Sequence, residues 1–387
     1  MVLRDLMQAE GAIWREVDGV EVPARYTTLE QEVSALRGGV GLSDRSYVCV
    51  LRLRGEDAYD LLDRCCPCAM YIRDGEVRHT VLLSEQGTPI LDLYVGNDDE
   101  SFFVFSEGKP AQEVLAYWRS MIPEGADIQI EPWNETHALL GLNGPFAWEL
   151  LAELEGHQVI GFPYATFYRS EEENLFFRLG KTGEYGYDIL VPRDKVAAYW
   201  ARVLEVGRSF DIRPVGFEAL EHAGLENFFF SIRREGALGL TPIELQLQWR
   251  VSYEKDFLGR AALEAVKTSD ARHRVTGIRS THPLGEGGAL YCEGECVGEV
   301  VVAMRSVTLG AWIGLGLLAL PWAQAGLALS TDGAKEADIR TVSMPFVRNM
   351  SMLINPQKHS YRDAASLEAL RRSLSQPDVW VETAGGA

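Results

Sequence analysis

The stretch that decides the fold of this chain is Ser84-Glu85-Gln86-Gly87-Thr88-Pro89-Ile90-Leu91-Asp92-Leu93-Tyr94-Val95. It predicts two strands joined by a tight turn, because Glu85-Gln86-Gly87 separates an apolar run at 81–83 from a β-rich run at 90–95. Asp92 lies inside the second strand, and a buried carboxylate has to be paired, protonated or turned toward a cavity. The alternative is an Asp on an edge strand that faces water. The stretch alone leaves both interpretations open.

Composition limits the class of protein. The chain has 387 residues, of which 47% are hydrophobic and 24% charged, as is ordinary for soluble globular proteins. This length exceeds what one hydrophobic core supports and predicts two or three domains. The net charge of −19 argues against a nucleic acid partner. No segment has the pattern of a signal peptide, so we expect a cytoplasmic protein with reduced thiols.

Six cysteines include two groups that invite comparison with metal sites. Cys65-Cys66-Pro67-Cys68 has no His at a ligand-like spacing, and the flanks of Cys292 and Cys296 are typical of a hairpin turn. Zinc sites usually combine two such pairs or add nearby histidines. We therefore expect no metal site.

One uncharged segment, residues 307–331, imitates a membrane span. Six residues argue against a span: four glycines, at 310, 314, 316 and 326, together with Pro321 and Gln324. No basic flank follows the segment, as the orientation of a membrane helix would require. The pattern favours two buried strands around a turn at Leu320-Pro321-Trp322, and thus no membrane association.

The order of predicted elements indicates several domains. Between Val48 and Ile130 the sequence predicts the β-α-β-β-α-β order of a ferredoxin-like domain. A second β-α-β-β-α set, from His137 to about Phe230, is predicted to be its structural repeat. Short strands with Gly turns over residues 274–346 predict a separate β domain. The last residues, 349–387, contain one predicted helix and are expected to form an appendage.

Several separated segments match one family when they are taken together in chain order. They are Val22-Pro23 with Tyr26, Arg37 with Gly41-Leu42-Ser43-Asp44-Arg45-Ser46, Gly55-Glu56-Asp57-Ala58, Gly87 with Asp92, Gly141-Leu142-Asn143-Gly144-Pro145, Thr182-Gly183-Glu184-Tyr185-Gly186-Tyr187, Pro214-Val215-Gly216, Leu225-Glu226, Thr241-Pro242-Ile243-Glu244 with Trp249, Lys255-Asp256-Phe257-Leu258-Gly259-Arg260, and Pro345-Phe346-Val347-Arg348. Over residues 14–348 the chain thereby resembles the aminomethyltransferase (glycine-cleavage T-protein) family. Relatives of that family include tetrahydrofolate-dependent demethylases and the folate domains of sarcosine and dimethylglycine dehydrogenases.

The resemblance implies an α+β fold with three domains in a ring around a central funnel that holds tetrahydrofolate. Two of the domains are of the β-α-β-β type, and the third is a small C-terminal β-barrel. The boundaries predicted for this chain are 1–50 with 136–265 for a discontinuous folate-binding domain and 51–135 for the ferredoxin-like domain with the acidic strand. Residues 270–348 are assigned to the barrel, and 349–387 lie outside the resemblance.

The resemblance also implies roles for individual residues. Asp92 would touch the reactive edge of the folate, where a carboxylate orients the cofactor and stabilises developing positive charge. Glu226 would accept hydrogen bonds from the pterin ring; without the resemblance it is an exposed helix residue. The other residues that we assign to the folate site are Tyr187, Trp249, Lys255, Arg260 and Arg348, and for Lys255 and Arg260 the alternative is a solvated loop.

The positions at which this chain departs from the family pattern are ones that we expect to contact the substrate rather than the folate. A single carboxylate stands at Leu91-Asp92 where the family has an Asp pair, and family tyrosines are replaced by His79 and Lys181. Two further family signatures are replaced by Glu218-Ala219-Leu220-Glu221-His222 and Glu32-Val33. We assign His79 to catalysis beside Asp92, and His79 and His222 are candidates for substrate contact or proton transfer. The alternative for each is a packing histidine.

These observations predict a tetrahydrofolate-dependent one-carbon transferase. The preferred hypothesis is a demethylase that moves a methyl or methylene-level group from a small O-, S- or N-methylated substrate to N5 of tetrahydrofolate. Precise positioning of the two reactants is worth about 7–11 kcal/mol in such a reaction. One alternative is a glycine-cleavage aminomethyltransferase, which needs a lipoyl carrier protein as its partner. The other is a folate-binding accessory protein without turnover.

Overall fold

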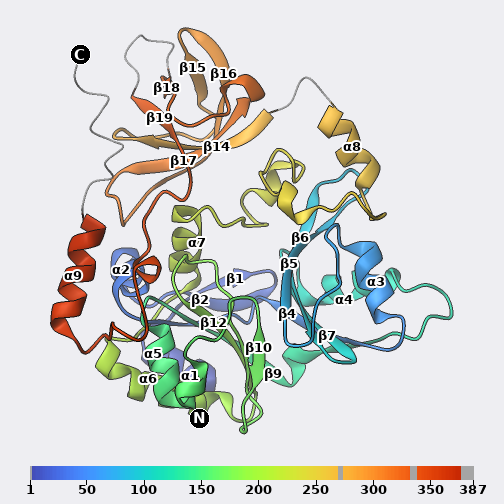
Figure 1. Ribbon diagram of the computed structural model, residues 1–387, viewed down its shortest axis with the longest axis vertical. Helices are drawn as coiled ribbons and strands as arrows, with labels where there is room; N and C mark the ends of the chain where they lie inside the picture. Colours follow the sequence, from blue (N-terminus) through green and yellow to red (C-terminus); the bar gives the residue numbers. More distant parts are fainter. Residues whose placement is uncertain (1, 269–272, 332–337, 376–387) are drawn as a thin grey trace.

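The computed structural model describes residues 2–268, 273–331 and 338–375. Three sheets surround a common centre (Figure 1). The β-barrel sheet lies at the top of the view, a five-stranded sheet lies at the right, and a six-stranded sheet lies below them. The segment between α7 and α8, drawn in yellow, passes through the middle of the ring.

The six-stranded sheet combines the beginning of the chain with residues much further along. Its strand order is β10-β11-β12-β9-β3-β13, in which β3 lies between β9 (antiparallel) and β13 (parallel). Helices cover it, and a hairpin of β1 and β2 lies between the first two of them in the chain. The elements are α1 (Leu3–Ala9), β1 (Ile13–Val17), β2 (Val20–Arg25), α2 (Leu29–Gly38), β3 (Gly41–Asp44), β9 (His137–Asn143), α5 (Ala147–Glu155), β10 (Phe167–Arg169), β11 (Leu175–Phe177), β12 (Gly186–Pro192), α6 (Val196–Gly207), β13 (Arg213–Pro214) and α7 (Phe217–Glu226).

The five-stranded sheet is inserted between β3 and β9. Its order is β5-β6-β7-β4-β8, and all its strands pair antiparallel. The elements are β4 (Cys49–Arg54), α3 (Ala58–Cys65), β5 (Val77–Leu83), β6 (Pro89–Asp98), β7 (Ser101–Glu107), α4 (Ala111–Ser120) and β8 (Gln129–Pro132). The predicted ferredoxin-like order was one strand short, because β5, β6 and β7 are three successive strands between the two helices.

The turn predicted at Glu85-Gln86-Gly87, within the stretch 84–95, is present. The N–H of Ser84 donates to the Thr88 carbonyl at 2.9 Å, and Gly87 adopts a positive φ of 77°, which glycine does without strain. Beyond the turn, side chains of β6 alternate between the two faces of the sheet. Leu91, Leu93 and Val95 pack into the core under α3 and α4, so Asp92 faces the centre of the ring.

The third sheet is a nearly closed barrel. Its order is β15-β16-β17-β14-β19-β18, and a bridge between Tyr291 and Ser330 joins its two edges. The strands are β14 (His273–Ser280), β15 (Ala289–Cys292), β16 (Glu295–Arg305), β17 (Trp312–Ala319), β18 (Ala328–Leu329) and β19 (Ile339–Val342). The uncharged segment forms β17, a turn at Leu320–Trp322 and β18, as predicted. Among the described residues, no helix is long and apolar enough to cross a membrane.

Two helices lie outside the three sheets. Helix α8 (Arg260–Thr268) follows the central segment and packs Leu263 near Gly87 of the opening turn. Helix α9 (Ala364–Ser375) packs Leu367 and Leu370 against the core of the six-stranded sheet. The C-terminal appendage is therefore attached to the first domain through apolar contacts.

Candidate functional site

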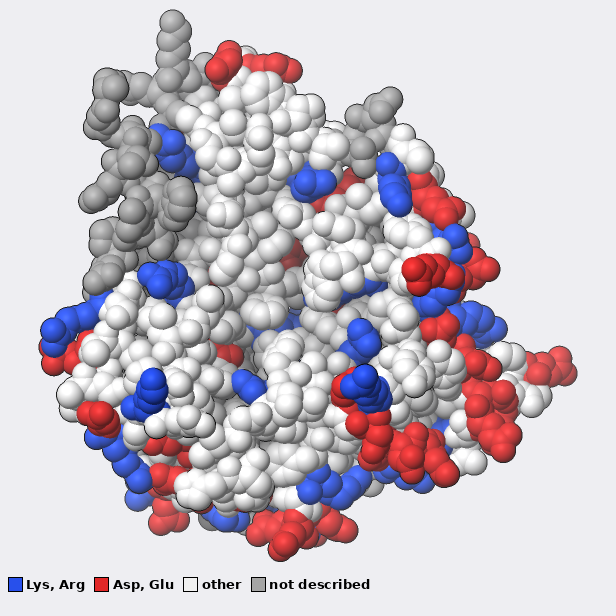
Figure 2. Space-filling model, viewed as in Figure 1, with Lys and Arg blue, Asp and Glu red and all other residues white. Residues whose placement is uncertain are grey.

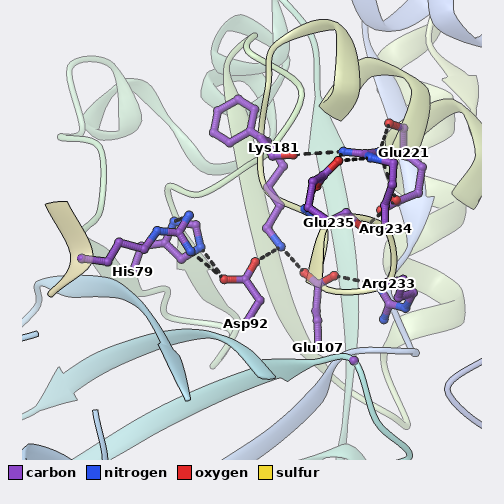
Figure 3. A network of polar contacts seen from close by, with 12 residues as sticks. His79, Asp92, Glu107, Lys181, Glu221, Arg233, Arg234 and Glu235 are labelled. Atoms are coloured by element: carbon purple, nitrogen blue, oxygen red, sulfur yellow. Dashed lines mark hydrogen bonds and ion pairs between the residues drawn. The ribbon is translucent and has the colours of Figure 1, made fainter. Parts of the chain in front are cut away.

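Asp92 is the centre of a buried ionic cluster (Figure 3). Its Oδ2 accepts from Lys181 Nζ at 2.6 Å, and its Oδ1 accepts from His79 Nε2 at 2.9 Å and Arg250 Nη1 at 3.0 Å. The Asp92 side chain is only 1% exposed. Burial alone would raise the pKa of Asp92, but Lys181, His79 and Arg250 outweigh it and hold that pKa well below its usual range. Asp92 is therefore an ionised and fully paired carboxylate.

The residues of the cluster come from three parts of the chain. His79 and Asp92 lie on the neighbouring strands β5 and β6, on the face turned toward the centre of the ring. Lys181 lies in the loop before β12, in the first domain. Arg250 ends a short 3₁₀ turn, Gln248–Arg250, in the central segment. Folding of the whole ring is thus needed to pair the carboxylate of β6.

Glu107 extends the cluster into the first domain. It accepts from Lys181 at 2.9 Å, from Arg45 at 3.0 Å and from Arg233 at 3.1 Å, and Figure 3 shows Lys181 between the two carboxylates. Burial would raise the pKa of Glu107, but these three cations outweigh it and lower that pKa to about 2. Lys181 thereby connects the five-stranded sheet to the six-stranded sheet.

His79 is held in one orientation and one tautomer. Its ring stacks on Tyr94, the residue opposite it on β6, with 4.0 Å between centroids. Arg250 Nη2 lies 3.2 Å from Nδ1 and has only hydrogens to offer, so Nδ1 accepts and Nε2–H donates to Asp92. Burial, together with the charge of Arg250, lowers the pKa of His79 to about 4. His79 is therefore neutral at neutral pH.

A cavity of about 680 Å³ opens beside this cluster, at the junction of the three sheets. This volume is in the range of sites for drug-sized ligands. Five lining residues are aromatic and two are arginines, and the lining contains no Asp or Glu among the described residues. The lining residues are Arg78, His79, Tyr164, Ala165, Asn227, Phe228, Phe229, Phe230, Gln246, Leu247, Trp249, Arg250, Thr276, Gly277, Ala323, Ala325, Val342, Ser343 and Met344.

Three residues of the cavity lining have a strained backbone conformation. Ala165, Phe228 and Gln246 have φ angles of 59°, 55° and 61°, although none of them is glycine. Such conformations cost roughly 1–3 kcal/mol each and persist where the surrounding structure enforces them, often at ligand sites. The strain therefore supports a functional role for the cavity.

Two protein-family models match this chain, one over the part that precedes the barrel and one over the barrel. Residues 3–255 match the model of the GCVT N-terminal domain, and residues 273–348 match that of the glycine cleavage T-protein C-terminal barrel domain. The chain belongs to the glycine cleavage T-protein family. This result confirms the resemblance inferred from the scattered motifs. Members of the family are tetrahydrofolate-dependent transferases of one-carbon groups.

Individual relatives are similar over most of their length. Aminomethyltransferases of Desulfitobacterium hafniense strain DCB-2 and Thermotoga maritima are each 28% identical, over 82% and 87% of this chain and 89% and 94% of their own. The crystal structure of aminomethyltransferase T of the glycine cleavage system from Bartonella henselae superimposes with a TM-score of 0.75 at 23% identity, over 89% of this chain and 97% of that protein. The predicted α+β T-protein fold with a C-terminal barrel is thereby confirmed.

The structure brings together only some of the residues assigned to the site from the sequence. Asp92 and His79 are in contact, and Trp249 lines the cavity beside them. Tyr187 is 1% exposed and packs in the core of the first domain. Arg348 is exposed and does not line the cavity.

Lys255 and Arg260 also lie away from the cavity lining. Lys255 pairs with Asp63 at 3.0 Å, and Arg260 pairs with Asp256 at 2.8 Å and Glu264 at 3.0 Å. Both basic residues are thus paired with carboxylates of the central segment, α3 or α8. Their predicted contact with the folate tail has no support from this geometry.

Glu226 is buried but already fully hydrogen-bonded. Its Oε2 accepts from Arg37 Nη2 at 2.8 Å and Thr308 Oγ1 at 2.7 Å, and its Oε1 accepts from Ser306 Oγ at 2.6 Å and the Thr308 N–H at 3.0 Å. His222 Nε2 lies 3.3 Å from Oε1 and accepts from the Val307 N–H. These contacts fasten α2 and α7 to the barrel, so we leave Glu226 and His222 out of the proposed folate site.

Arg250, Lys181 and Glu107 belong to the cluster around Asp92 but were not assigned to a site from the sequence. Lys181 was visible as a departure from the family pattern, but its partner was not. For Arg250 the signal was a basic residue directly after Trp249, in an uncharged run that follows Glu244. Nothing local in the sequence pairs Arg250 with Asp92, which is 158 residues away.

The neutral state of His79 predicts a pH-dependent stability. In the unfolded chain His79 binds a proton near its ordinary pKa of 6.5, but in the fold it does so only near 4. Acidification through this window therefore favours the unfolded state. Between pH 7 and pH 5, urea unfolding is expected to show wild type losing about 2 kcal/mol more than His79→Asn. Equal losses in the two proteins would contradict a neutral buried His79.

The contacts of Glu226 predict a structural phenotype. Glu226→Gln removes the charge that balances buried Arg37, and we expect about 3 kcal/mol lower stability in urea unfolding. Tetrahydrofolate affinity, measured by calorimetry, is expected to stay within about threefold. Glu368→Gln on exposed α9, whose carboxylate pairs with Arg372 at the surface, is the matched control and should change stability little. Lost folate affinity at unchanged stability would instead place Glu226 at the pterin.

Proposed function

We propose that this protein is a tetrahydrofolate-dependent demethylase that transfers a methyl group from a small methylated donor to N5 of the folate. The single observation that carries the proposal is the central cavity, whose lining is aromatic and basic and includes His79 and Arg250, two of the residues that bind Asp92. Family membership supplies the cofactor, and the cavity supplies a site for both reactants.

The lining fits tetrahydrofolate in chemical character. Phe228, Phe229 and Trp249 offer flat apolar surface for a pterin or aminobenzoate ring. Asn227 and Gln246 carry amides that both donate and accept hydrogen bonds, as the pterin edge requires. Bound there, tetrahydrofolate supplies the amine nucleophile at N5.

The chain's own residues orient the reactants and set the local charge. Asp92 is fixed by three partners, so its position does not change as charge develops nearby. His79, neutral and stacked on Tyr94, presents one edge of its ring to the cavity. The aromatic walls exclude water from the reacting atoms.

The charge balance favours a methyl donor over an aminomethyl donor. A cationic aminomethyl group needs an unpaired carboxylate nearby, but Asp92 is already paired with Lys181 and Arg250. Burying a cation beside two others without a free counter-charge is unfavourable. A donor that is neutral at its methyl group avoids this cost.

Aminomethyl transfer of the glycine-cleavage type is the second candidate. The names of the curated relatives favour it, and it requires a lipoyl carrier protein as partner. The two functions differ in product. Methyl transfer gives 5-methyltetrahydrofolate, whereas aminomethyl transfer gives a methylene-level folate and ammonia. A cytoplasmic location fits both and remains a prediction.

The first test is folate binding. Tetrahydrofolate is expected to bind wild type in calorimetry, and Trp249→Ala is expected to weaken it about tenfold because an aromatic wall is lost. Tyr59→Ala, which removes a half-exposed aromatic side chain on α3 away from the cavity, is the control and should leave affinity unchanged. Absence of binding by wild type would overturn the proposed function.

The second test identifies the reaction. We expect 5-methyltetrahydrofolate to form from a panel of methyl ethers, thioethers and methylamines, detected by mass spectrometry. Asp92→Asn is expected to lower kcat by about 10²-fold or more, since the carboxylate that orients the site is lost. Formation of a methylene-level folate from an aminomethyl-lipoyl carrier, with no methyl product from the panel, would favour the second candidate.

A further inference from the structure

The first residues of the C-terminal appendage, Asn349, Met350 and Ser351, are largely buried. Asn349 is 5% exposed and Met350 is 3% exposed. They directly follow residue 348, where the match to the barrel-domain model ends. Here the chain runs down past α2 before it forms α9 (Figure 1). Polar groups are buried at a cost unless they are hydrogen-bonded, so the partners of this segment need to be identified.

The partners lie in the loop that carries Lys181, residues 181–185. Among the described residues, no backbone hydrogen bond joins two members of this loop. Such a backbone has to be fixed by side chains from elsewhere in the chain. Lys181 has a long and flexible stem, and its Nζ donates to Asp92 at 2.6 Å and to Glu107 at 2.9 Å. It reaches both carboxylates together only while the loop keeps its position.

Ser351 holds the far end of this loop through Glu184. The Glu184 side chain is 1% exposed. It accepts from the N–H of Met350 at 3.2 Å and from the N–H and hydroxyl of Ser351 at 2.8 and 2.6 Å. The same hydroxyl accepts from the N–H of Tyr185 at 2.9 Å. One serine thus satisfies a buried carboxylate and a backbone donor of the loop, and removing it leaves both without a partner.

Asn349 holds the near end of the loop through contacts whose direction is set by Arg37. Arg37 only donates, so the Asn349 oxygen accepts from its Nη1 at 3.2 Å. The Asn349 amide nitrogen then donates to the Asn227 oxygen, and the Asn227 nitrogen donates to the Thr182 carbonyl at 2.8 Å. Arg37 donates to the same carbonyl at 2.5 Å. The carbonyl next to Lys181 is therefore held from two sides.

Gly183 shows how closely these side chains pack against the loop. It has a φ of 80°. A Cβ atom at this position would lie 2.2 Å from Oδ1 of Asn227 and 2.4 Å from Nδ2 of Asn349, which no side chain tolerates. The loop and the two amides are therefore in direct contact, and a shift of Asn349 is transmitted to the loop.

The position of Lys181 matters because Asp92 depends on buried partners for its charge balance. Asp92 is 1% exposed, and Lys181 is 17% exposed. Figure 2 shows the acidic side chains mainly along the right edge of this face, whereas its centre is uncharged or basic. Because the energy of an ion pair falls with distance, a displaced Lys181 leaves the carboxylate of Asp92 less neutralised.

We propose that Ser351 and Asn349 are positioning residues of the site. They hold the loop so that the Lys181 ammonium stays between Asp92 and Glu107. The beginning of the appendage is then part of the functional site, although the matched family ranges end at residue 348. The inference concerns the ionic cluster itself and applies to both candidate functions.

The pKa of His79, measured by ¹⁵N NMR, reports on this arrangement. The charge of Lys181 opposes protonation of His79, whose pKa is about 4. If Lys181 moves away from Asp92, that carboxylate attracts the proton more strongly and the pKa of His79 rises. With Ser351→Ala and with Asn349→Ala we expect a rise of about half a unit or more. Ser351→Thr keeps the hydroxyl and is expected to retain the wild-type value.

Ser360→Ala is the matched control. The Ser360 hydroxyl also donates from the appendage to a carboxylate, that of Glu149 on α5, and neither residue lines the central cavity. We expect Ser360→Ala to lower the Tm but to leave the pKa of His79 unchanged. The inference is overturned if the pKa of His79 stays at its wild-type value in folded Ser351→Ala and Asn349→Ala, or if Ser360→Ala shifts it equally.

A double-mutant cycle shows whether Ser351 acts through Lys181. In Lys181→Met the pKa of His79 is expected to be raised already, so that adding Ser351→Ala changes it by less than about 0.2 unit. An undiminished effect of Ser351→Ala in this background means another route and contradicts the inference. If Lys181→Met does not fold, Lys181→Gln, which keeps hydrogen-bond donors at this position, takes its place.

Turnover separates this inference from the proposed function. With a methyl donor, Ser351→Ala is expected to lower kcat about tenfold with little change in KM, because the cluster is displaced while the cavity walls remain. If the pKa of His79 shifts but no donor yields 5-methyltetrahydrofolate, the proposed function fails and the inference stands. If methyl transfer proceeds and the pKa of His79 does not respond to Ser351→Ala or Asn349→Ala, the inference fails and the proposed function stands.

Discussion

The ion pair between Lys181 and Asp92, 2.6 Å long and almost entirely buried, is the interaction on which the rest of the site depends. A carboxylate at this depth is tolerated only because cations from other parts of the chain neutralise it. Lys181 comes from the first domain and Arg250 from the central segment, so pairing Asp92 also holds the three sheets around one cavity. Removing any one of these partners leaves a buried charge without compensation. The loss of folding free energy is then larger than the net contribution of the intact pair.

The same framework serves a different charge pattern from the one expected of the family. The chain has the T-protein fold, with a TM-score of 0.75 to an aminomethyltransferase structure, and the C-terminal barrel domain of the family. Near the reacting atoms it has His79, Lys181 and Arg250, and the one carboxylate of β6 is fully engaged by them. We propose that the fold sets where the one-carbon group is transferred, and that the local charge selects its donor.

Local pattern was sufficient to predict the elements that build the site but not the contacts within it. The strand-turn-strand at 84–95 follows from alternation and from Gly87, and a carboxylate within an apolar strand was a sound reason to select Asp92. Arg250 was missed because its partner lies 158 residues away, and the contacts of Glu226 with Arg37, 189 residues away, and with the barrel loop were not foreseen either. Tyr187 followed the family motif, yet strand alternation turns it into the core of the first domain. Such pairings are set by packing of whole domains, which periodicity does not encode.

The most direct test of this account is the protonation state of His79, because it reports the charge balance at Asp92. Nitrogen NMR of the protein with ¹⁵N-labelled histidine measures both ring nitrogens as a function of pH. The account predicts that His79 stays neutral, with its proton on Nε2, from pH 8 to pH 5, and is protonated only near pH 4. Titration near its ordinary pKa of 6.5, or a proton on Nδ1, would show that Arg250 and Lys181 do not hold the cluster as described.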